Sequence, residues 1–405
     1  MIVNKKLIDY IIMALTIFLI DSFYIFEMKS WGRYVIIVVA FAILLITAIN
    51  NHGVVVIKTE AYHRFFIAFI LVCFASVVWA WNPYLALVKS ITLFEIFVCM
   101  SMIYPYFRTN NDIDELIKIF MISGYILCVY TLLYYGRSEI VSYLSNNIRI
   151  GNDYTNANAL GLVASMSIII QVYYIINKRS NLWVLFLLPA VIVLAISQSR
   201  KAIVMVVLGI AFLIGTNAAN KNRLKRLLNM AVALLILGLM LFVLSRVPIF
   251  EGVMRRFVTF FESLNGQRAE DIRSVFRRIG LEQFRKTPIL GIGIGNSLEL
   301  LEKSGYGRTY LHSNMVELLA CLGIVGFIVY YSIYFYLGFK LLKYRRNNHG
   351  ETNLCFVLLV MMFIMDYAQV TYYDKVQYLY FMCFFLEVRF RELSYCEKTV
   401  ISVEK

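Results

Sequence analysis

The chain carries little charge for its length. Only 16% of its 405 residues are Asp, Glu, Lys or Arg, and 60% are hydrophobic, whereas a soluble domain has about a quarter charged residues. Apolar runs of about 17–25 residues recur from end to end, and each is long enough to cross a hydrocarbon core of about 30 Å. The runs are continuous rather than alternating, which excludes a β-barrel. The composition therefore predicts an all-α, polytopic integral membrane protein.

Several motifs of soluble enzymes and binding proteins are also missing. None of the seven cysteines lies in a CxxC pair, so neither a disulfide framework nor a cysteine metal site is expected. The stretch "GIGIGN" lacks the GK[ST] ending of a phosphate loop and the third glycine of a dinucleotide fingerprint. No basic module interleaved with aromatic residues is visible, which argues against a nucleic-acid partner. The sequence therefore gives no reason to expect a cofactor.

The apolar runs divide into about twelve candidate spans in one membrane domain, 1–405, with spans over about 7–247 and 313–390. With both termini in the cytoplasm, the Lys- and Arg-rich loops fall on the inner side, as the positive-inside rule requires. The same topology makes 248–312 a large extracytoplasmic loop, in which we expect short helices. The predicted spans are roughly 7–26, 34–50, 65–81, 85–104, 116–135, 158–176, 182–197, 201–217, 228–247, 313–342, 354–371 and 376–390.

The large loop has a bias toward arginine. From Arg246 to Arg308 the chain has nine arginines and only two lysines. Arginine presents a planar fork that matches phosphate, and lysine does not, so an anionic partner such as a lipid-held phosphate or pyrophosphate is one interpretation. The alternative is an interfacial helix, because Phe276 and its apolar neighbours form a stripe flanked by Arg273, Arg277 and other arginines.

A glycine cluster and a histidine end the loop. Gly291, Gly293 and Gly295 are typical of a tight turn in which backbones approach closely. His312 precedes an apolar helix, for which Asn314 is an expected N-cap and Glu317 the partner in a capping-box-like pair. The positive end of the helix dipole favours neutral imidazole, which is able to act as a general base. A hydrogen-bonded interfacial histidine is the alternative interpretation.

Other acidic residues are weaker candidates. Asp112 and Asp114 form an Asp-x-Asp pattern that many nucleotide-sugar transferases use for a metal, but here they begin a helix, where Asp is an ordinary cap. Glu95 and Asp366 lie inside predicted spans, where an ionised group costs about 2.5–3.5 kcal/mol on insertion scales. Both are therefore functional candidates, although the sequence identifies no partner for either. No metal site is expected.

Three passages resemble the family of O-antigen ligases and O-antigen or capsule polymerases. The first, "PILGIGIGNS…YLHSNMVELLACLGIVGFI", fits the family pattern of a histidine, a small polar residue, nine positions, glycine, two positions and glycine. The second, "RIGNDYTNANALG", is similar to an Arg-x-Gly…Asn-Pro-Asn-x-x-Gly passage, with Ala157 in place of proline. The third, "SQSRKA", is similar to a Ser-Arg-Gly passage, with Lys201 in place of glycine. The matching residues are His312, Ser313, Gly323, Gly326, Arg149, Gly151, Asn156, Asn158 and Arg200.

The resemblance implies a GT-C-like membrane glycosyltransferase that needs no metal. Such enzymes transfer a sugar chain from undecaprenyl pyrophosphate to an acceptor hydroxyl at the outer face of the cytoplasmic (inner) membrane. It implies His312 as the catalytic base and phosphate or sugar ligands on this chain. The implied ligands are Arg149, Arg200, Arg273, Arg277, Arg308 and Asn158.

The resemblance leaves the acceptor open. A polymerase uses a second lipid-linked repeat unit, and a ligase uses lipopolysaccharide core. Polymerases are the more diverse and numerous group, which favours an O-antigen or capsule polymerase, with room for a chain-length regulator as a further partner. A flippase for the same lipid-linked oligosaccharide is the alternative from another class. The absence of a clear internal repeat and the concentration of polar chemistry in one external loop argue against a flippase.

Overall fold

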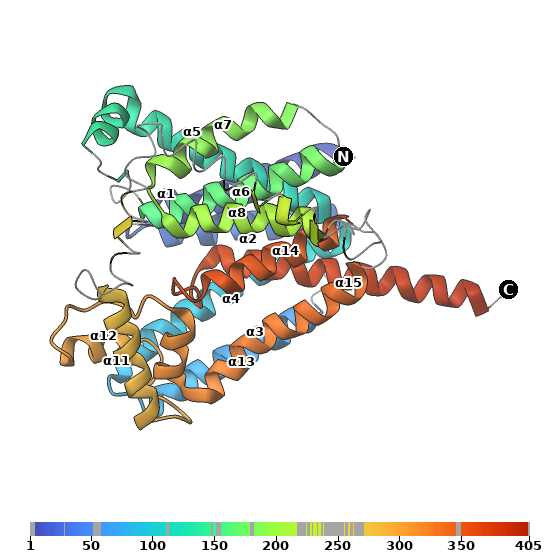
Figure 1. Ribbon diagram of the computed structural model, residues 1–405. Coiled ribbons are helices and arrows are strands. Elements are labelled where there is room, and N and C mark those ends of the chain that lie inside the picture. Colours follow the sequence, from blue (N-terminus) through green and yellow to red (C-terminus); the bar gives the residue numbers. More distant parts are fainter. Residues whose placement is uncertain are drawn as a thin grey trace. The chain divides into compact units, whose positions relative to one another are not determined.

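The computed structural model (Figure 1) describes residues 5–27, 29–51, 58–110, 113–146, 149–150, 155–178, 182–216, 271–345 and 350–403, with scattered positions between 224 and 262. Every element in these ranges is a helix. Seven of the described helices are long and apolar enough to cross a membrane, and two shorter apolar helices accompany them. The prediction of an all-α, polytopic membrane protein is therefore confirmed.

The helices follow the predicted spans closely. The predicted span 228–247 lies mostly outside the described residues, and each of the other eleven coincides with a helix. The predicted span 354–371 is too long, because its helix ends at Met365 and leaves Asp366 in the following turn. The helices are α1 (Lys5–Ile25), α2 (Gly32–Asn50), α3 (Ala61–Ala75) with the short η1 (Ser76–Val78), α4 (Pro83–Asn110), α5 (Ile113–Ser145), α6 (Ala157–Lys178), α7 (Leu182–Ile196), α8 (Arg200–Thr216), α13 (Asn314–Tyr344), α14 (Gly350–Met365) and α15 (Lys375–Val403).

The chain forms two compact units. Unit 1 consists of Met1–Gly53, Asn110–Glu262 and Leu341–Met361, and unit 2 of Val54–Thr109, Ser263–Lys340 and Met362–Lys405. In unit 1 the buried faces of α5 to α8 form an apolar core that includes Leu160, Val193 and Ile203. The single membrane domain predicted from the sequence stays a prediction.

Two short helices occupy the described part of the predicted loop, in unit 2. They are α11 (Ile272–Lys286) and α12 (Ser297–Lys303), which lie beside each other in Figure 1. Asp271 caps α11 by accepting a hydrogen bond from the Arg273 backbone N–H at 3.2 Å. Phe276 of α11 is buried against Leu301 of α12 and Leu311 before α13. This small apolar core fixes α11 over the start of α13.

Candidate functional site

A break in helix α13 shapes the loop before it. Gly323, within α13, has φ 61°, so the helix is interrupted there. The glycine loop fills the break, because the N–H of Gly293 donates to the Cys321 carbonyl at 2.8 Å and the N–H of Ile324 donates to the Pro288 carbonyl at 2.8 Å. These bonds satisfy backbone groups that the break removes from the helical pattern.

Glycine is required on both sides of this contact. A Cβ at Gly291, where φ is 66°, would lie 2.4 Å from the carbonyl carbon of Cys321. A Cβ at Gly323 would lie 2.2 Å from the carbonyl oxygen of Ile289. Any side chain at either position would therefore push the loop out of the break. Gly293 and Gly295 also have positive φ, 93° and 73°.

The connection between α3 and α4 holds the other side of the glycine loop. The indole N–H of Trp79 donates to the Leu290 carbonyl at 3.0 Å, and the N–H of Trp81 donates to the Ile292 carbonyl at 3.0 Å. The Asn296 side chain accepts from the Asn82 N–H at 2.7 Å. The loop is thus a rigid support rather than a free connection.

His312 lies immediately before α13 in a left-handed backbone conformation, with φ 57°. This region is uncommon for residues other than glycine. The half-buried imidazole stacks on the Phe276 ring, with ring centres 5.9 Å apart and an angle of 6° between the planes. The Tyr310 ring lies 4.3 Å from it, centre to centre. Two aromatic rings therefore fix the imidazole plane.

A buried polar network holds the start of α13 under His312. Asn314 was expected to cap this helix, and that prediction is wrong. Its amide oxygen accepts hydrogen bonds from the N–H groups of Thr371 and Tyr372 at 3.0 and 2.9 Å, and its amide nitrogen donates to Tyr331. Its own N–H donates to the Asp366 carbonyl at 2.8 Å. Asn314 therefore ties α13 to the turn after α14.

Asp366 belongs to this network. One carboxylate oxygen accepts from the Thr371 hydroxyl at 2.5 Å, and the other accepts from the Tyr331 hydroxyl at 3.1 Å. Glu317 holds the opposite side, because it accepts from the Leu311 N–H at 2.9 Å and from the Ser297 hydroxyl. The sequence did not reveal Tyr331 and Ser297 as partners, because they lie 35 and 20 residues from the carboxylates they contact.

Two loop arginines lie close in sequence to Phe276, whose ring stacks on His312. Arg277 follows Phe276 in α11; its guanidinium donates to Ser274 at 3.1 Å and lies 5.0 Å from the centre of the Tyr367 ring. Arg273 lies one turn earlier, is half-buried, and its side chain has no hydrogen-bond or ion-pair partner among the described residues. Arg308 is half-exposed and lies 3.5 Å from the Glu302 carboxylate.

The second and third passages come together in unit 1. Arg149 donates from Nε to the Ser197 carbonyl at 3.0 Å and from Nη2 to the Asn158 side-chain oxygen at 2.8 Å. The Ser199 hydroxyl donates to the same oxygen at 3.3 Å. Gln198, between the two serines, has φ 47°, and Arg200 begins α8 as a half-buried residue.

These contacts give Asn158 a clear structural role. Its side-chain oxygen accepts one bond from Arg149 within the second passage and one from Ser199 of the third, so it orients the Arg149 guanidinium. Helix α6 approaches this turn closely because Gly161 has no side chain. A Cβ added there would lie 2.8 Å from the Ser197 hydroxyl oxygen. Because Arg149 and Arg200 lie in unit 1 and His312 in unit 2, their convergence on one site stays a prediction.

The acidic candidates have ordinary surroundings. Asp112 lies outside the described residues, and Asp114 accepts from the Tyr174 hydroxyl at 2.8 Å and pairs with Lys118 at 2.7 Å. Glu95 is exposed on α4. Among the described residues, no group of three or more His, Cys, Asp or Glu side chains is placed to hold a metal ion.

A comparison with known protein families finds a match that includes this region. Residues 184–331 match the O-antigen ligase family. The matched segment contains the glycine loop, α11, α12, His312 and the break at Gly323, and it confirms the resemblance seen in the sequence. A search of curated proteins finds no match.

The O-antigen ligase family is a glycosyltransferase-like family of membrane enzymes. The match, together with the apolar helices, supports an integral membrane enzyme of O-antigen assembly, for which the family implies lipid-linked oligosaccharide substrates. The match includes Arg200 but not Arg149 or Asn158. The hydrogen bonds between Arg149 and the Ser197–Ser199 turn connect the unmatched passage to the matched segment.

Proposed function

We propose that the chain is a polysaccharide polymerase that joins undecaprenyl-pyrophosphate-linked repeat units at the outer face of the cytoplasmic membrane. The observation that carries this proposal is the arrangement of His312. A histidine in a strained backbone, stacked on Phe276 beside Arg273 and Arg277 of α11, lies within a segment that matches the O-antigen ligase family. Strained residues held by their surroundings are concentrated at functional sites.

In the proposed reaction His312 acts as the general base. Its imidazole accepts the proton of the acceptor hydroxyl while that oxygen attacks the anomeric carbon of the donor sugar. The bond between the anomeric carbon and the phosphate oxygen breaks, and undecaprenyl pyrophosphate leaves with the bonding electron pair. Arginines balance the charge that grows on the leaving group. The proposed reaction uses no metal and no cofactor.

Five arginines are proposed as ligands of the pyrophosphate. Arg273 and Arg277 belong to the α11 face that carries Phe276, and Arg308 precedes His312 by four residues at the exposed end of the loop. Arg149 and Arg200, with Asn158 as the residue that orients Arg149, are proposed as pyrophosphate ligands from unit 1. Arginine suits this role because its fork binds two phosphate oxygens at once.

A ligase is the second candidate, favoured by the description of the matched family. The two reactions share the donor and the base, and differ only in the acceptor. Purified full-length protein should therefore be incubated in detergent with one synthetic lipid-linked repeat unit, and the products separated on a gel. A ladder of longer chains supports the polymerase. Transfer only when lipopolysaccharide core is added supports the ligase. A flippase would leave the donor unchanged in detergent and would move it across the membrane when the protein is placed in vesicles. That result would contradict both the polymerase and the ligase.

A further inference from the structure

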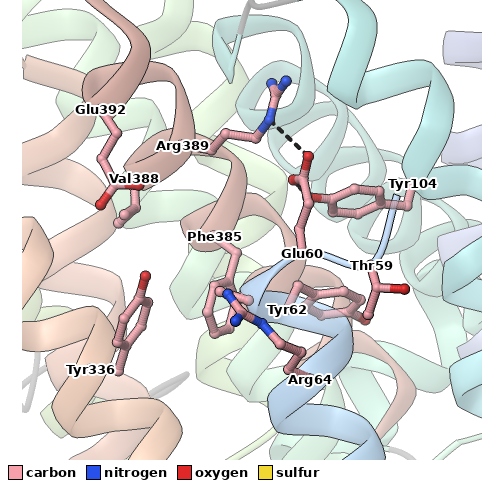
Figure 2. Close-up of a pocket in the computed structure, with 11 residues that line it drawn as sticks. Thr59, Glu60, Tyr62, Arg64, Tyr104, Tyr336, Phe385, Val388, Arg389 and Glu392 are labelled. Atoms are coloured by element: carbon pink, nitrogen blue, oxygen red, sulfur yellow. Dashed lines mark hydrogen bonds and ion pairs between the residues drawn. The ribbon is translucent and has the colours of Figure 1, made fainter. Parts of the chain in front are cut away.

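A second polar site lies at the far end of unit 2. A cavity of about 270 Å³ opens where α3 begins and α15 passes the end of α13 (Figure 2). The candidate span Ala61–Val78 separates it from the candidate active site, since Tyr62 in the cavity wall precedes Trp79, which contacts the glycine loop, by 17 residues. At 1.5 Å per residue this is a distance of about 25 Å, close to the thickness of a hydrocarbon core. The cavity therefore belongs to the opposite membrane boundary.

The carboxylates of this site are already paired with cations. Glu60 Oε1 lies 2.6 Å from Arg108 Nε and 3.0 Å from Arg389 Nε, the second contact being the dashed line in Figure 2. Its other oxygen accepts from the Tyr104 hydroxyl. Burial acts to raise the pKa of Glu60, but these hydrogen bonds and the arginine charges outweigh it and hold the pKa below its ordinary value. Glu60 is thus ionised, and the two arginines balance its charge.

The second carboxylate is paired in the same way, because Glu392 lies 2.6 Å from Lys340 Nζ. Arg64 remains without such a partner. It lines the cavity, is exposed, and its guanidinium makes no hydrogen bond or ion pair with any described residue. The charged residues that line the cavity are therefore two cations, Arg64 and Arg389, and two carboxylates, Glu60 and Glu392. Arg108 and Lys340 lie behind them as partners of the carboxylates.

A buried hydroxyl also lacks a partner. Tyr62 lines the cavity with only 2% of its surface exposed, and its hydroxyl has no hydrogen-bond partner among the described residues. Unpaired buried polar atoms are uncommon and costly. The walls beside it are aromatic, since Tyr336 and Phe385 stack with ring centres 5.6 Å apart. The cavity therefore combines an unpaired cation with an aromatic wall, and the Tyr62 hydroxyl is enclosed behind that wall.

We propose that this cavity binds the phosphate group of an anionic phospholipid. The Arg64 guanidinium would pair with the phosphate oxygens, and the aromatic wall of Tyr336 and Phe385 would lie beside the lipid. Phe335 and Phe339, which are 72% and 70% exposed on the adjacent turns of α13, provide an apolar surface for the acyl chains. Inorganic phosphate shares the charge but makes no use of the aromatic wall or of these phenylalanines.

The test is thermal unfolding of the purified full-length protein in a neutral detergent, titrated with phosphatidylglycerol, phosphatidylcholine or inorganic phosphate. Phosphatidylglycerol should raise the midpoint to a plateau, and the other two should not. An equal rise with phosphatidylcholine would show general stabilisation by lipid and overturn the proposal. An equal rise with inorganic phosphate would show a site for soluble phosphate, which also overturns it.

A variant and a control locate the binding. Arg64→Gln should weaken the apparent phosphatidylglycerol affinity by about tenfold or more, because one charge-assisted contact is lost. Arg285→Gln, an exposed arginine of α11, should leave the affinity unchanged. Unaltered affinity in Arg64→Gln, or an equal loss in Arg285→Gln, would overturn the assignment.

Discussion

The backbone of His312 costs free energy, and its neighbours hold it in place. A residue other than glycine in the left-handed region costs about 1–3 kcal/mol. On one side the Leu311 N–H is bound by Glu317, and on the other the Asn314 N–H is bound by the Asp366 carbonyl. Because these bonds hold the backbone one peptide beyond His312 on each side, the conformation of His312 has little freedom. Such a strained conformation is expected where an imidazole must face a substrate in one orientation.

Replacing His312 should separate catalysis from binding. His312→Ala should lower the rate of polymer formation about 10²–10⁴-fold, the usual contribution of a general base. His312→Gln should be nearly as slow, since an amide donates a hydrogen bond but does not accept the proton. The measurement is the initial rate with a synthetic donor, accompanied by donor binding. If the alanine variant fails to bind donor, His312 is a pyrophosphate ligand and the base lies elsewhere.

Arginine and lysine should not be equivalent in unit 1. Arg149→Lys loses one of its bonds to the Ser197 carbonyl and the Asn158 side chain, because one ammonium cannot reproduce the planar fork. We expect a strong loss of polymer from this variant and from Arg200→Lys, and a lower thermal midpoint for Arg149→Lys. Arg137→Lys, at an exposed position of α5, is the control. Near-normal polymer from both test variants would show that these arginines are only structural.

At the scale of elements, the sequence predicted the positions of the helices but not the contacts between them. The spans are a local property of long apolar runs, so the start of α13 was predicted within one residue. The break at Gly323 was not predicted, because it depends on hydrogen bonds to Pro288 and Ile289, more than thirty residues away. The family motif marked Gly323 and Gly326 as important, and it did so without giving the physical reason.

The break provides a direct test of the loop support. Gly323→Ala should destabilise the protein by more than about 1–2 kcal/mol, the cost of the left-handed conformation, because its methyl group also collides with the Ile289 carbonyl. Gly338→Ala in the same helix, where no atom lies within 4 Å, should be neutral or stabilising by up to about 1 kcal/mol. The measurement is the midpoint of thermal unfolding for each variant. Equal midpoints would show that the break at Gly323 does not require glycine.

The ion cluster where α3, α4 and α15 meet should make stability depend on pH. At neutral pH, Glu60→Gln should cost about 1.5–3 kcal/mol, the usual value for hydrogen bonds to charged groups. The pKa of Glu60 lies below its ordinary value of 4.5 in the folded protein, so the stabilisation is complete above pH 4.5 and is lost as pH falls through the lower folded value. The gap in thermal midpoint between wild type and variant should therefore narrow below pH 4.5. A constant gap would contradict this.

At the scale of the whole molecule, the family match extends across both units. It runs from α7 and α8 of unit 1 into α11, α12 and α13 of unit 2. The family motifs are therefore distributed over two bodies. That they form one site is implied by the resemblance and stays a prediction. The hydrogen bonds within each unit explain how the motifs are held, and the proposed joint site requires the two parts to face the same side of the membrane.

The proposed site also requires the loop to lie opposite the C-terminal end of α15, and the cysteines provide the test. Cys396 is exposed, whereas the other six cysteines are buried, so an impermeant maleimide on intact spheroplasts should leave the wild type unlabelled until lysis. In a Cys396→Ser background, Ser304→Cys places a single thiol on the exposed turn after α12. This variant should be labelled before lysis. Labelling of Cys396 in intact spheroplasts, or of the Ser304→Cys variant only after lysis, would place the loop in the cytoplasm. His312 would then face the side away from the outer surface, where the lipid-linked oligosaccharide is proposed to react, and the assignment of the base would fail with the topology.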